Sequence, residues 1–148
     1  LLPALQDSDA KIRKHAAWAL GEIEDPRAAD ALLVALADDD AEVRRAVIHG
    51  LGELDLRQAP ARLMDALQDV DPQVRQAAAH TLSHIGDPLA VPALTAALQD
   101  TDVKVRRAAL MALADMPNEA AVNALLEALK DADPQVRKAA AQALGKHD

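Results

Sequence analysis

The sequence contains no cysteine, no phenylalanine and no tyrosine, and Trp18 is its only aromatic residue. Without cysteine the chain has neither a disulfide nor a thiolate metal site. A groove that stacks nucleic acid bases needs several aromatic side chains and an excess of basic ones. This chain instead carries 16 Lys and Arg against 24 Asp and Glu, a net charge of −8. Nucleic acid and anionic membranes are therefore not expected as partners.

Long hydrophobic runs and a basic, apolar leader are also missing. We therefore expect a soluble, cytoplasmic protein. Its 148 residues suit one compact domain or one short repeat array, and 51% of them are apolar. Because aromatic residues are almost absent, alanine and leucine must form the interior.

The sequence repeats itself at an interval of 31 residues along its whole length. The polar positions that recur are Arg13, Arg44, Arg75, Arg106 and Arg137, together with Asp7, Asp38, Asp69, Asp100 and Asp131. The apolar positions that recur in step include Leu5, Leu36, Leu67, Leu98 and Leu129, and Ile12, Val43, Val74, Val105 and Val136. Such periodicity predicts one structural unit copied five times.

Each unit is predicted to contain two helices, as the stretch 25–55 illustrates. Asp25 and Pro26 form an N-cap and first-turn pair, and the first helix then carries Leu32, Leu33 and Leu36 at helical spacing. Asp40 is positioned to cap a second helix, whose apolar stripe is Val43, Val47, Leu51 and Leu54. Gly21, Gly52 and Gly145 lie near the ends of the second helices and are consistent with termination there, but only Gly86 is at the position expected of a C′ residue.

Short amphipathic helices of this kind become stable only when they pack on similar pairs. We predict an all-α fold, an α-solenoid of stacked antiparallel helix pairs wound as a right-handed αα superhelix. The expected organisation is a single repeat domain, 1–148, with units at 1–24 (truncated), 25–55, 56–86, 87–117 and 118–148. Small residues at equivalent positions, Ala46, Ala77, Ala108 and Ala139, should let neighbouring helices approach to about 8 Å.

One sequence pattern recurs in four units: Asp38 with Val43–Arg44, Asp69 with Val74–Arg75, Asp100 with Val105–Arg106, and Asp131 with Val136–Arg137. With this pattern the unit resembles a HEAT-like repeat of the short kind found in phycobilisome lyase subunits and in designed consensus-repeat proteins. In that family such Asp and Arg residues form a ladder between successive repeats. A guanidinium one turn into the second helix can also bind loop carboxylates and carbonyls bidentately. We therefore expect Arg13, Arg44, Arg75, Arg106 and Arg137, with Asp38, Asp69, Asp100 and Asp131, to be structural.

The exposed side chains of the second helices are the candidate binding surface, because in such stacks these helices line the concave side. The candidate partner-binding residues are Lys14, His15, Trp18, Glu22, Arg45, His49, Glu53, His80, His84, Arg107 and Met111. These positions differ between units, as a recognition surface would, although relaxed surface positions vary as well. Their mildly positive charge fits an acidic peptide or a mixed-charge protein surface, and ordinary solvated helix charge explains it equally. Trp18 either anchors a partner or covers the truncated first unit.

Catalytic chemistry is not indicated by any motif. His80 and His84 are spaced i, i+4, as metal-binding pairs are, although a solvated pair of histidines has the same spacing. No serine lies beside a histidine in a nucleophile arrangement, and there is no glycine-rich phosphate loop. We therefore predict no enzyme activity, no cofactor and no metal. The expected function is a scaffold that binds a protein or peptide on its concave face.

Three alternatives remain open. The resemblance to phycobilisome lyase subunits implies a lyase or lyase-subunit role on a tetrapyrrole–protein conjugate. A designed or orphan repeat protein would have no natural ligand. The first unit shows no polar cap, so the chain is either a piece of a longer array or associates with a second copy through that end.

Overall fold

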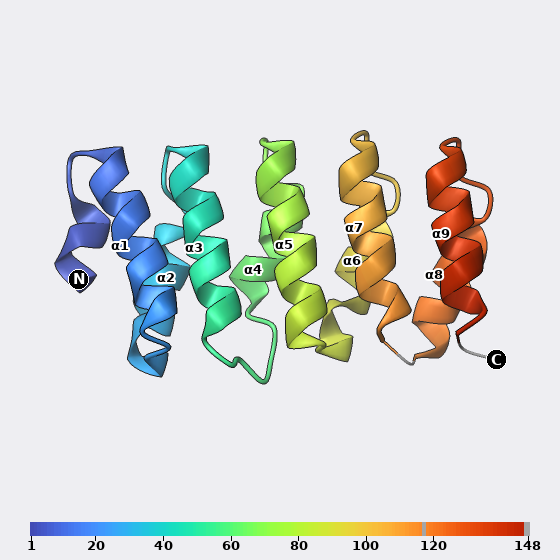
Figure 1. Cartoon of the computed structure of the whole chain (residues 1–148), viewed down its shortest axis with the longest axis horizontal. Helices are drawn as coiled ribbons and strands as arrows, with labels where there is room; N and C mark the ends of the chain where they lie inside the picture. Colours follow the sequence, from blue (N-terminus) through green and yellow to red (C-terminus); the bar gives the residue numbers. More distant parts are fainter. Residues whose placement is uncertain (117, 147–148) are drawn as a thin grey trace.

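The computed structural model describes residues 1–116 and 118–146, and within them the chain is helical with no strand. Successive units stack into an elongated row, with the termini at opposite ends (Figure 1). The second helices of the units lie side by side: α1 (Ala10–Glu22), α3 (Ala41–Glu53), α5 (Pro72–Ile85), α7 (Val103–Ala114) and α9 (Pro134–Leu144). The chain is therefore an α-solenoid, as predicted.

The first helices form the other layer and are shorter. The first unit has only a 3-10 helix, η1 (Leu2–Gln6). Three units combine a 3-10 turn with a short α-helix: η2 (Pro26–Ala28) with α2 (Ala29–Ala35), α4 (Ala61–Asp65) with η3 (Ala66–Gln68), and η4 (Pro88–Ala90) with α6 (Val91–Ala97). Only α8 (Glu119–Ala128), which begins after Asn118, is a longer α-helix. The first helix predicted for 25–55 is present, and its first turn has the 3-10 form. Asp25 and Pro26 do start a helix, but Pro26 opens a tight 3-10 turn before the α-helix begins.

The second helices begin where the sequence predicts. The Asp40 carboxylate accepts hydrogen bonds from the backbone N–H groups of Glu42 and Val43, at 2.7 and 3.2 Å. Equivalent aspartates cap the four remaining second helices: Asp9, Asp71, Asp102 and Asp133. Each cap satisfies backbone donors that the helix itself leaves unpaired, so it defines the boundary between the two helices of a unit.

Only one glycine ends its helix in the predicted left-handed conformation. Gly86 has φ of +67° at the end of α5. By contrast, Gly21 and Gly52 are the second-to-last residues of α1 and α3, so they lie near the helix ends without forming the caps. Gly21 instead packs against Gly50 of the next second helix, because a Cβ added at Gly21 would lie 2.6 Å from the Gly50 Cα. Glycine is required there to let two helix backbones touch.

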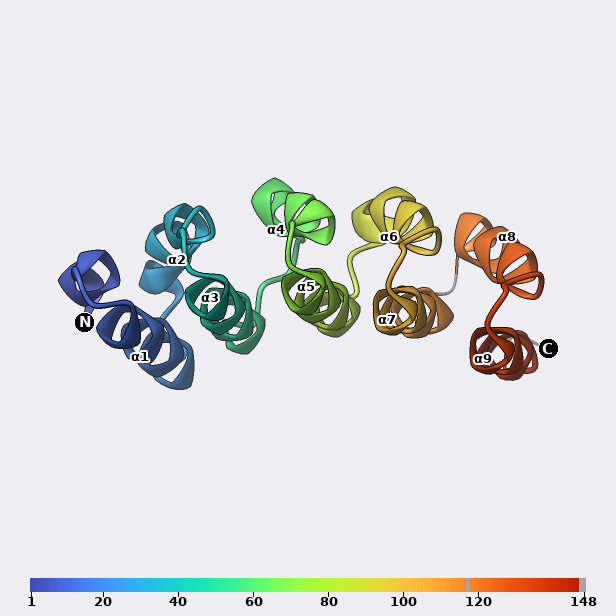
Figure 2. The ribbon, with the colours of Figure 1, turned by 90° about the horizontal axis from the view of Figure 1, so that it is seen from above.

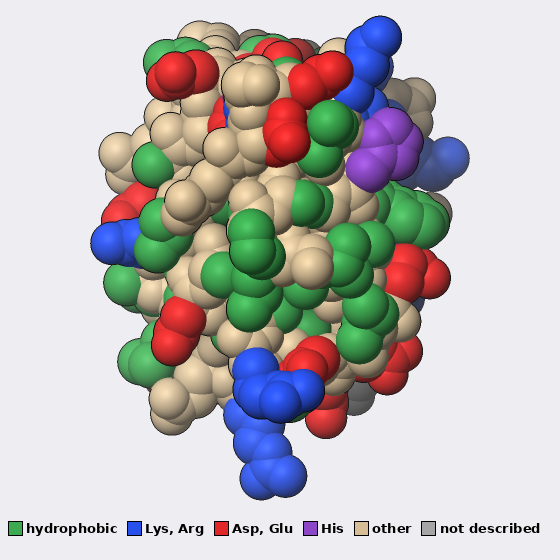
Figure 3. All heavy atoms as spheres, turned by 90° about the vertical axis from the view of Figure 1, so that its left-hand side faces the viewer, with side chains coloured by type: hydrophobic (Ala, Val, Ile, Leu, Met, Phe, Trp, Pro, Cys, Tyr) green, Lys and Arg blue, Asp and Glu red, His purple; other side chains and the backbone are tan. Residues whose placement is uncertain are grey.

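The core lies between the two helix layers and consists of aliphatic side chains from both. The largest fully buried side chains include Leu32, Leu51, Leu63, Leu82, Leu94, Leu113 and Leu125. At the end of the stack formed by η1 and α1, some apolar side chains are more exposed than the side chains at equivalent positions of other units. Ile12 is 44% exposed, whereas its counterpart Val74 is fully buried, because α1 is the first of the second helices that the structure describes and has such a neighbour on one side only. Figure 3 shows hydrophobic side chains gathered at the centre of this end, bordered by charged ones.

The row of units is bowed. Seen from above, the second helices follow the inner side of the bow and the first helices its outer side (Figure 2). The exposed side chains of α1, α3, α5, α7 and α9 therefore share the concave face. In the described residues no helix is both long and apolar enough to cross a membrane, and α5, with 14 residues, is the longest of them.

Candidate partner-binding face

The recurrent arginines do not belong to the concave face, because they bridge the loops at one edge of the stack. Arg13, Arg44, Arg75 and Arg106 each bind the aspartate of the following unit, with Nε to Oδ2 distances of 2.7, 2.8, 2.7 and 2.8 Å. A second bond joins Nη2 to Oδ1, and Nη1 donates to a loop carbonyl of the arginine's own unit. Each guanidinium thus ties two units together bidentately, and we call this set the ladder.

The ladder carboxylates are held in their charged form. The hydrogen bond from Arg13 lowers the pKa of Asp38, which also accepts the backbone N–H of Asp40. Burial raises the pKa of Asp69, Asp100 and Asp131, but hydrogen bonds from the neighbouring arginine and from the backbone outweigh it, so the net direction is down. Arg137 differs from the other four, because within the described residues its side chain donates hydrogen bonds only to the Asp131 and Ala132 carbonyls.

The eleven candidate partner-binding residues all lie on the second helices α1, α3, α5 and α7. Nine are exposed, and Lys14 and Arg45 are half-buried. The largest apolar members are Trp18 and Met111, whose exposed fractions are 49% and 55%. They occupy the same position of two different units, so both belong to one row across the concave face. We call this the central row, and it consists of Trp18, His49, His80, Met111 and Gln142.

The central row contains one preformed aromatic contact. The ring of His49 stacks on Trp18, with centroids 5.3 Å apart and planes inclined by 13°. On its other side, His49 Nε2 lies 3.8 Å from Glu53 Oε1. Trp18, His49 and Glu53 therefore form a continuous group across α1 and α3, which leaves about half of the Trp18 surface open to solvent.

A polar chain runs beside this group, one turn closer to the start of the helices. Glu42 accepts hydrogen bonds from Lys14 Nζ at 3.0 Å and from Arg45 Nη1 at 2.6 Å, and these lower the pKa of Glu42. Arg45 also donates to the side chain of Gln73, at 2.8 Å. These polar contacts link α1, α3 and α5 at the surface and orient the side chains of Lys14 and Arg45.

The four histidines that the structure describes form no larger cluster. His80 lies 3.4 Å from the amide of Gln76, and His15 Nδ1 bonds the Lys11 carbonyl at 2.6 Å. Across the described residues no group of three or more His, Asp or Glu side chains is arranged to hold a metal ion. His80 and His84 thus share a helix face without a third ligand, and the residues described do not complete the metal site that their spacing suggests.

Comparison with known proteins supports one family. Models of HEAT repeats match residues 1–48, 30–104 and 91–148. The chain belongs to the HEAT repeat family. No curated protein matches it significantly.

Solved structures similar to this HEAT repeat chain include natural and designed proteins. The complex of CpcE and CpcF of phycocyanin lyase from Nostoc sp. PCC7120 is 31% identical, with a TM-score of 0.83 over 99% of this chain and 63% of that one. This chain thus spans less than two thirds of that relative. An engineered protein is 26% identical, with a TM-score of 0.69 over 99% of this chain and 77% of that one. A designed armadillo repeat protein in complex with the peptide (KR)4 is 18% identical, with a TM-score of 0.70 over 99% and 80%. The last likeness concerns the fold alone.

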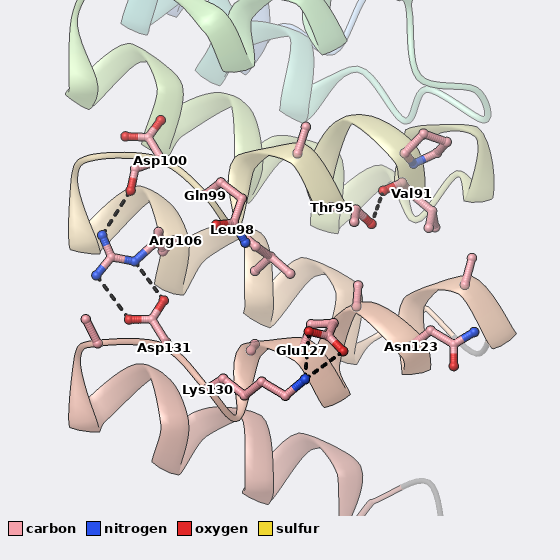
Figure 4. A pocket seen from close by; sticks show the side chains of 16 residues that line it. Val91, Thr95, Leu98, Gln99, Asp100, Arg106, Asn123, Glu127, Lys130 and Asp131 are labelled. Carbon is pink, nitrogen blue, oxygen red and sulfur yellow. Dashed lines mark hydrogen bonds and ion pairs between the residues drawn. The ribbon is translucent and has the colours of Figure 1, made fainter.

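The HEAT repeat units also form a groove that sequence reasoning missed. It lies between the first helices α6 and α8, has a volume of about 1170 Å³, and is lined by small side chains such as Ala96, Ala120 and Ala124. Figure 4 shows the ladder pair Arg106–Asp131 at one end of the groove and the ion pair of Lys130 with Glu127, at 3.1 Å, along its side. The sequence signal for this groove is the alanines of consecutive first helices, such as Ala96, Ala120 and Ala124, whose small side chains leave the space between the helices open.

Proposed function

We propose that the chain is a non-catalytic scaffold that holds a protein or peptide on its concave face. The observation that carries this proposal is the central row, where Trp18 and Met111 expose 49% and 55% of their surface and Trp18 is already stacked on His49. A large, preoriented aromatic side chain loses little entropy on binding and so often anchors a partner.

Position distinguishes these two residues from other exposed apolar side chains. Val34 and Leu89 are 61% and 68% exposed, but they lie singly on the first-helix layer and belong to no row. Scattered apolar residues of that kind occur on any protein surface. Trp18 and Met111 instead occupy equivalent positions on one curved face, where one ligand can contact several units at once.

A similar structure supports a protein or peptide as the ligand. The solved structure in question is a complex of CpcE with CpcF, two proteins that bind each other. In this chain the ladder and the helix caps account for the recurrent charged residues, which leaves the variable residues of the concave face as the candidates for recognition.

The test is a selection of binders from a library of random peptides, followed by binding to matched variants. Trp18→Ala combined with Met111→Ala should abolish binding of the selected peptides while helical content, measured by circular dichroism, is unchanged. The control combines Val34→Ala with Leu89→Ala and removes a similar apolar area from the other layer, so it should leave binding intact. Peptides that bind the Trp18/Met111 variant normally would reject the concave face.

A second candidate function is a subunit role on a tetrapyrrole–protein conjugate. It is favoured by the 31% identity to the phycocyanin lyase complex over 99% of this chain. The face offers little for such a ligand, because Trp18 is the only aromatic residue and Glu22 the nearest carboxylate on its own helix face. Mixing the protein with free bilin tests this role. A shifted visible absorption band would support it, and an unchanged spectrum would reject it.

Association of two copies through the end formed by η1 and α1 stays a prediction. The exposed Leu2 and Ile12 at that end, 46% and 44%, support it. A solution mass of one chain, unchanged by Ile12→Glu, would reject it.

A further inference from the structure

The concave face carries charges of opposite sign on the two sides of the central row. On three second helices a cation lies four residues before the central residue and an anion four residues after it. These triplets are Lys14, Trp18 and Glu22; Arg45, His49 and Glu53; and Arg107, Met111 and Asp115. The other two helices carry Gln76, His80 and His84, and Lys138, Gln142 and Lys146. One flank is therefore basic in four units, and the other is acidic in three.

Neither flank is neutralised by its own neighbours. Lys14 and Arg45 share the single carboxylate of Glu42, at 3.0 and 2.6 Å, so two cations face one anion. Among the residues that the structure describes, Arg107 and Lys138 make no ion pair, and neither does Glu22. Asp115 accepts only a long hydrogen bond, 3.5 Å, from the Ser83 hydroxyl. Both flanks thus retain charge for an external ligand.

The spacing of the rows matches an α-helix. Residues eight apart on a helix are separated by about 12 Å, so the basic and acidic flanks stand about one helix diameter from each other. Neighbouring second helices lie about 8–10 Å apart, and one heptad of a helix laid across them advances about 10.5 Å. One residue per heptad can therefore face each unit. Side chains on one side of an extended strand recur every ~6.6 Å and fall out of register.

We propose that the occupant of this face is an amphipathic α-helix of a partner protein, which rests on the proposed function above. Its apolar stripe covers the central row, with carboxylates along one edge facing Lys14, Arg45 and Arg107. Cations along its other edge face Glu22, Glu53 and Asp115. Turning such a helix end for end exchanges its two edges, so the two charged flanks fix the direction in which the partner runs.

The experiment uses three synthetic helical peptides of four heptads, about 42 Å long, with the same leucine stripe and the same composition. One has glutamates along one edge and lysines along the other. The second has the two edges exchanged, and the third has both residue types mixed along both edges. Each is labelled at its N- or C-terminus with an acceptor of tryptophan fluorescence. Because Trp18 is the only tryptophan and lies on α1, energy transfer reports which terminus reaches that end of the row.

We expect the two edge-sorted peptides to bind about tenfold more tightly than the mixed peptide, as several weak surface ion pairs add up. They should also run in opposite directions, so that energy transfer comes from opposite termini. Arg107→Glu combined with Asp115→Arg should weaken the sorted peptides severalfold. Arg27→Glu, which removes only the exposed ion pair of Arg27 with Asp25 on the first-helix side of the stack, should have no effect. Circular dichroism verifies that both variants remain folded.

Equal binding of all three peptides without a preferred direction would overturn the proposed charge pairing and leave the proposed function standing. Binding by none of them would overturn the helical occupant. The proposed function is tested separately, by whether binding of peptides selected from the random library requires Trp18 and Met111.

Discussion

Replacing Gly50 with alanine tests whether direct backbone contact between α1 and α3 is needed for stability. A Cβ added at Gly50 would lie 2.8 Å from the backbone oxygen of Ala17, and Gly21 on the facing helix is equally confined. Backbone atoms cannot rotate away as a side chain does, so the two helices must separate. Overpacking of this kind costs about 1–3 kcal/mol.

A matched control lies two residues away on the same helix. A Cβ added at Gly52 would approach only the Thr81 side chain, at 3.4 Å, which is ordinary contact distance. Gly52→Ala should therefore gain the usual helix-propensity benefit of about 0.5–1 kcal/mol. Gly50→Ala gains the same benefit but loses more to the clash. The two variants should differ by about 2 kcal/mol in the free energy of unfolding, with Gly52→Ala the more stable.

Urea titration followed by both circular dichroism and Trp18 fluorescence is the appropriate assay. Repeat arrays need not unfold in one step, and Trp18 lies on α1, next to the perturbed contact, so its fluorescence reports local separation. We expect the fluorescence midpoint of Gly50→Ala to fall further than its helical midpoint. Equal midpoints for Gly50→Ala and Gly52→Ala would refute the claim that the helices meet backbone to backbone.

Three further predictions concern the ladder and the central row. Arg75→Met removes the bidentate bond to Asp100 and should lower the free energy of unfolding by about 1–2 kcal/mol. Arg137→Met loses only hydrogen bonds to carbonyls, so it should lower the free energy of unfolding by less in the same urea titration. Because the pKa of Asp38, Asp69, Asp100 and Asp131 is lowered in the folded chain, their stabilisation should be complete above about pH 4, the value of an unfolded aspartate, and disappear as the pH falls through the lower folded pKa. Urea midpoints between pH 7 and pH 2 measure this loss, and Asp100→Asn should make it smaller. Finally, His49→Ala should make Trp18 more accessible to acrylamide quenching, while Gln142→Ala, at the far end of the same row, should not change it.

The sequence predicts the fold well because the ladder and the helix caps each require particular residue types at fixed positions. An aspartate that caps a helix and an arginine that binds the next unit each tolerate few substitutes, so Asp40, Arg44 and their counterparts recur at 31 residues. The same recurrence locates the second helices and, through their variable positions, the exposed central row.

The first helices were harder to predict, because their boundaries depend on competition between turn types. Asp25–Pro26 signals a helix start, but the signal does not distinguish a 3-10 turn from an α-helix. The close contact of Gly21 with Gly50 was missed for another reason. It joins residues 29 apart rather than 31, since facing positions on neighbouring helices are offset from equivalent ones. Gly52 and Thr81 face each other at the same offset.

Most contacts that hold the fold together involve residues other than those proposed for recognition, so the proposed experiments can distinguish a loss of binding from a loss of stability. The ladder bonds and the aliphatic core join the units, and the capping aspartates start the second helices. On the concave face, Lys14, Arg45 and His49 add contacts between units only at the surface. Trp18 and Met111 contribute little to burial, because about half of each remains exposed. Substitutions in the central row should therefore change binding at nearly constant stability, whereas Gly50 and Arg75 should change stability first. A central-row variant that unfolded the chain would show that the concave face is part of the framework and that binding must be sought elsewhere.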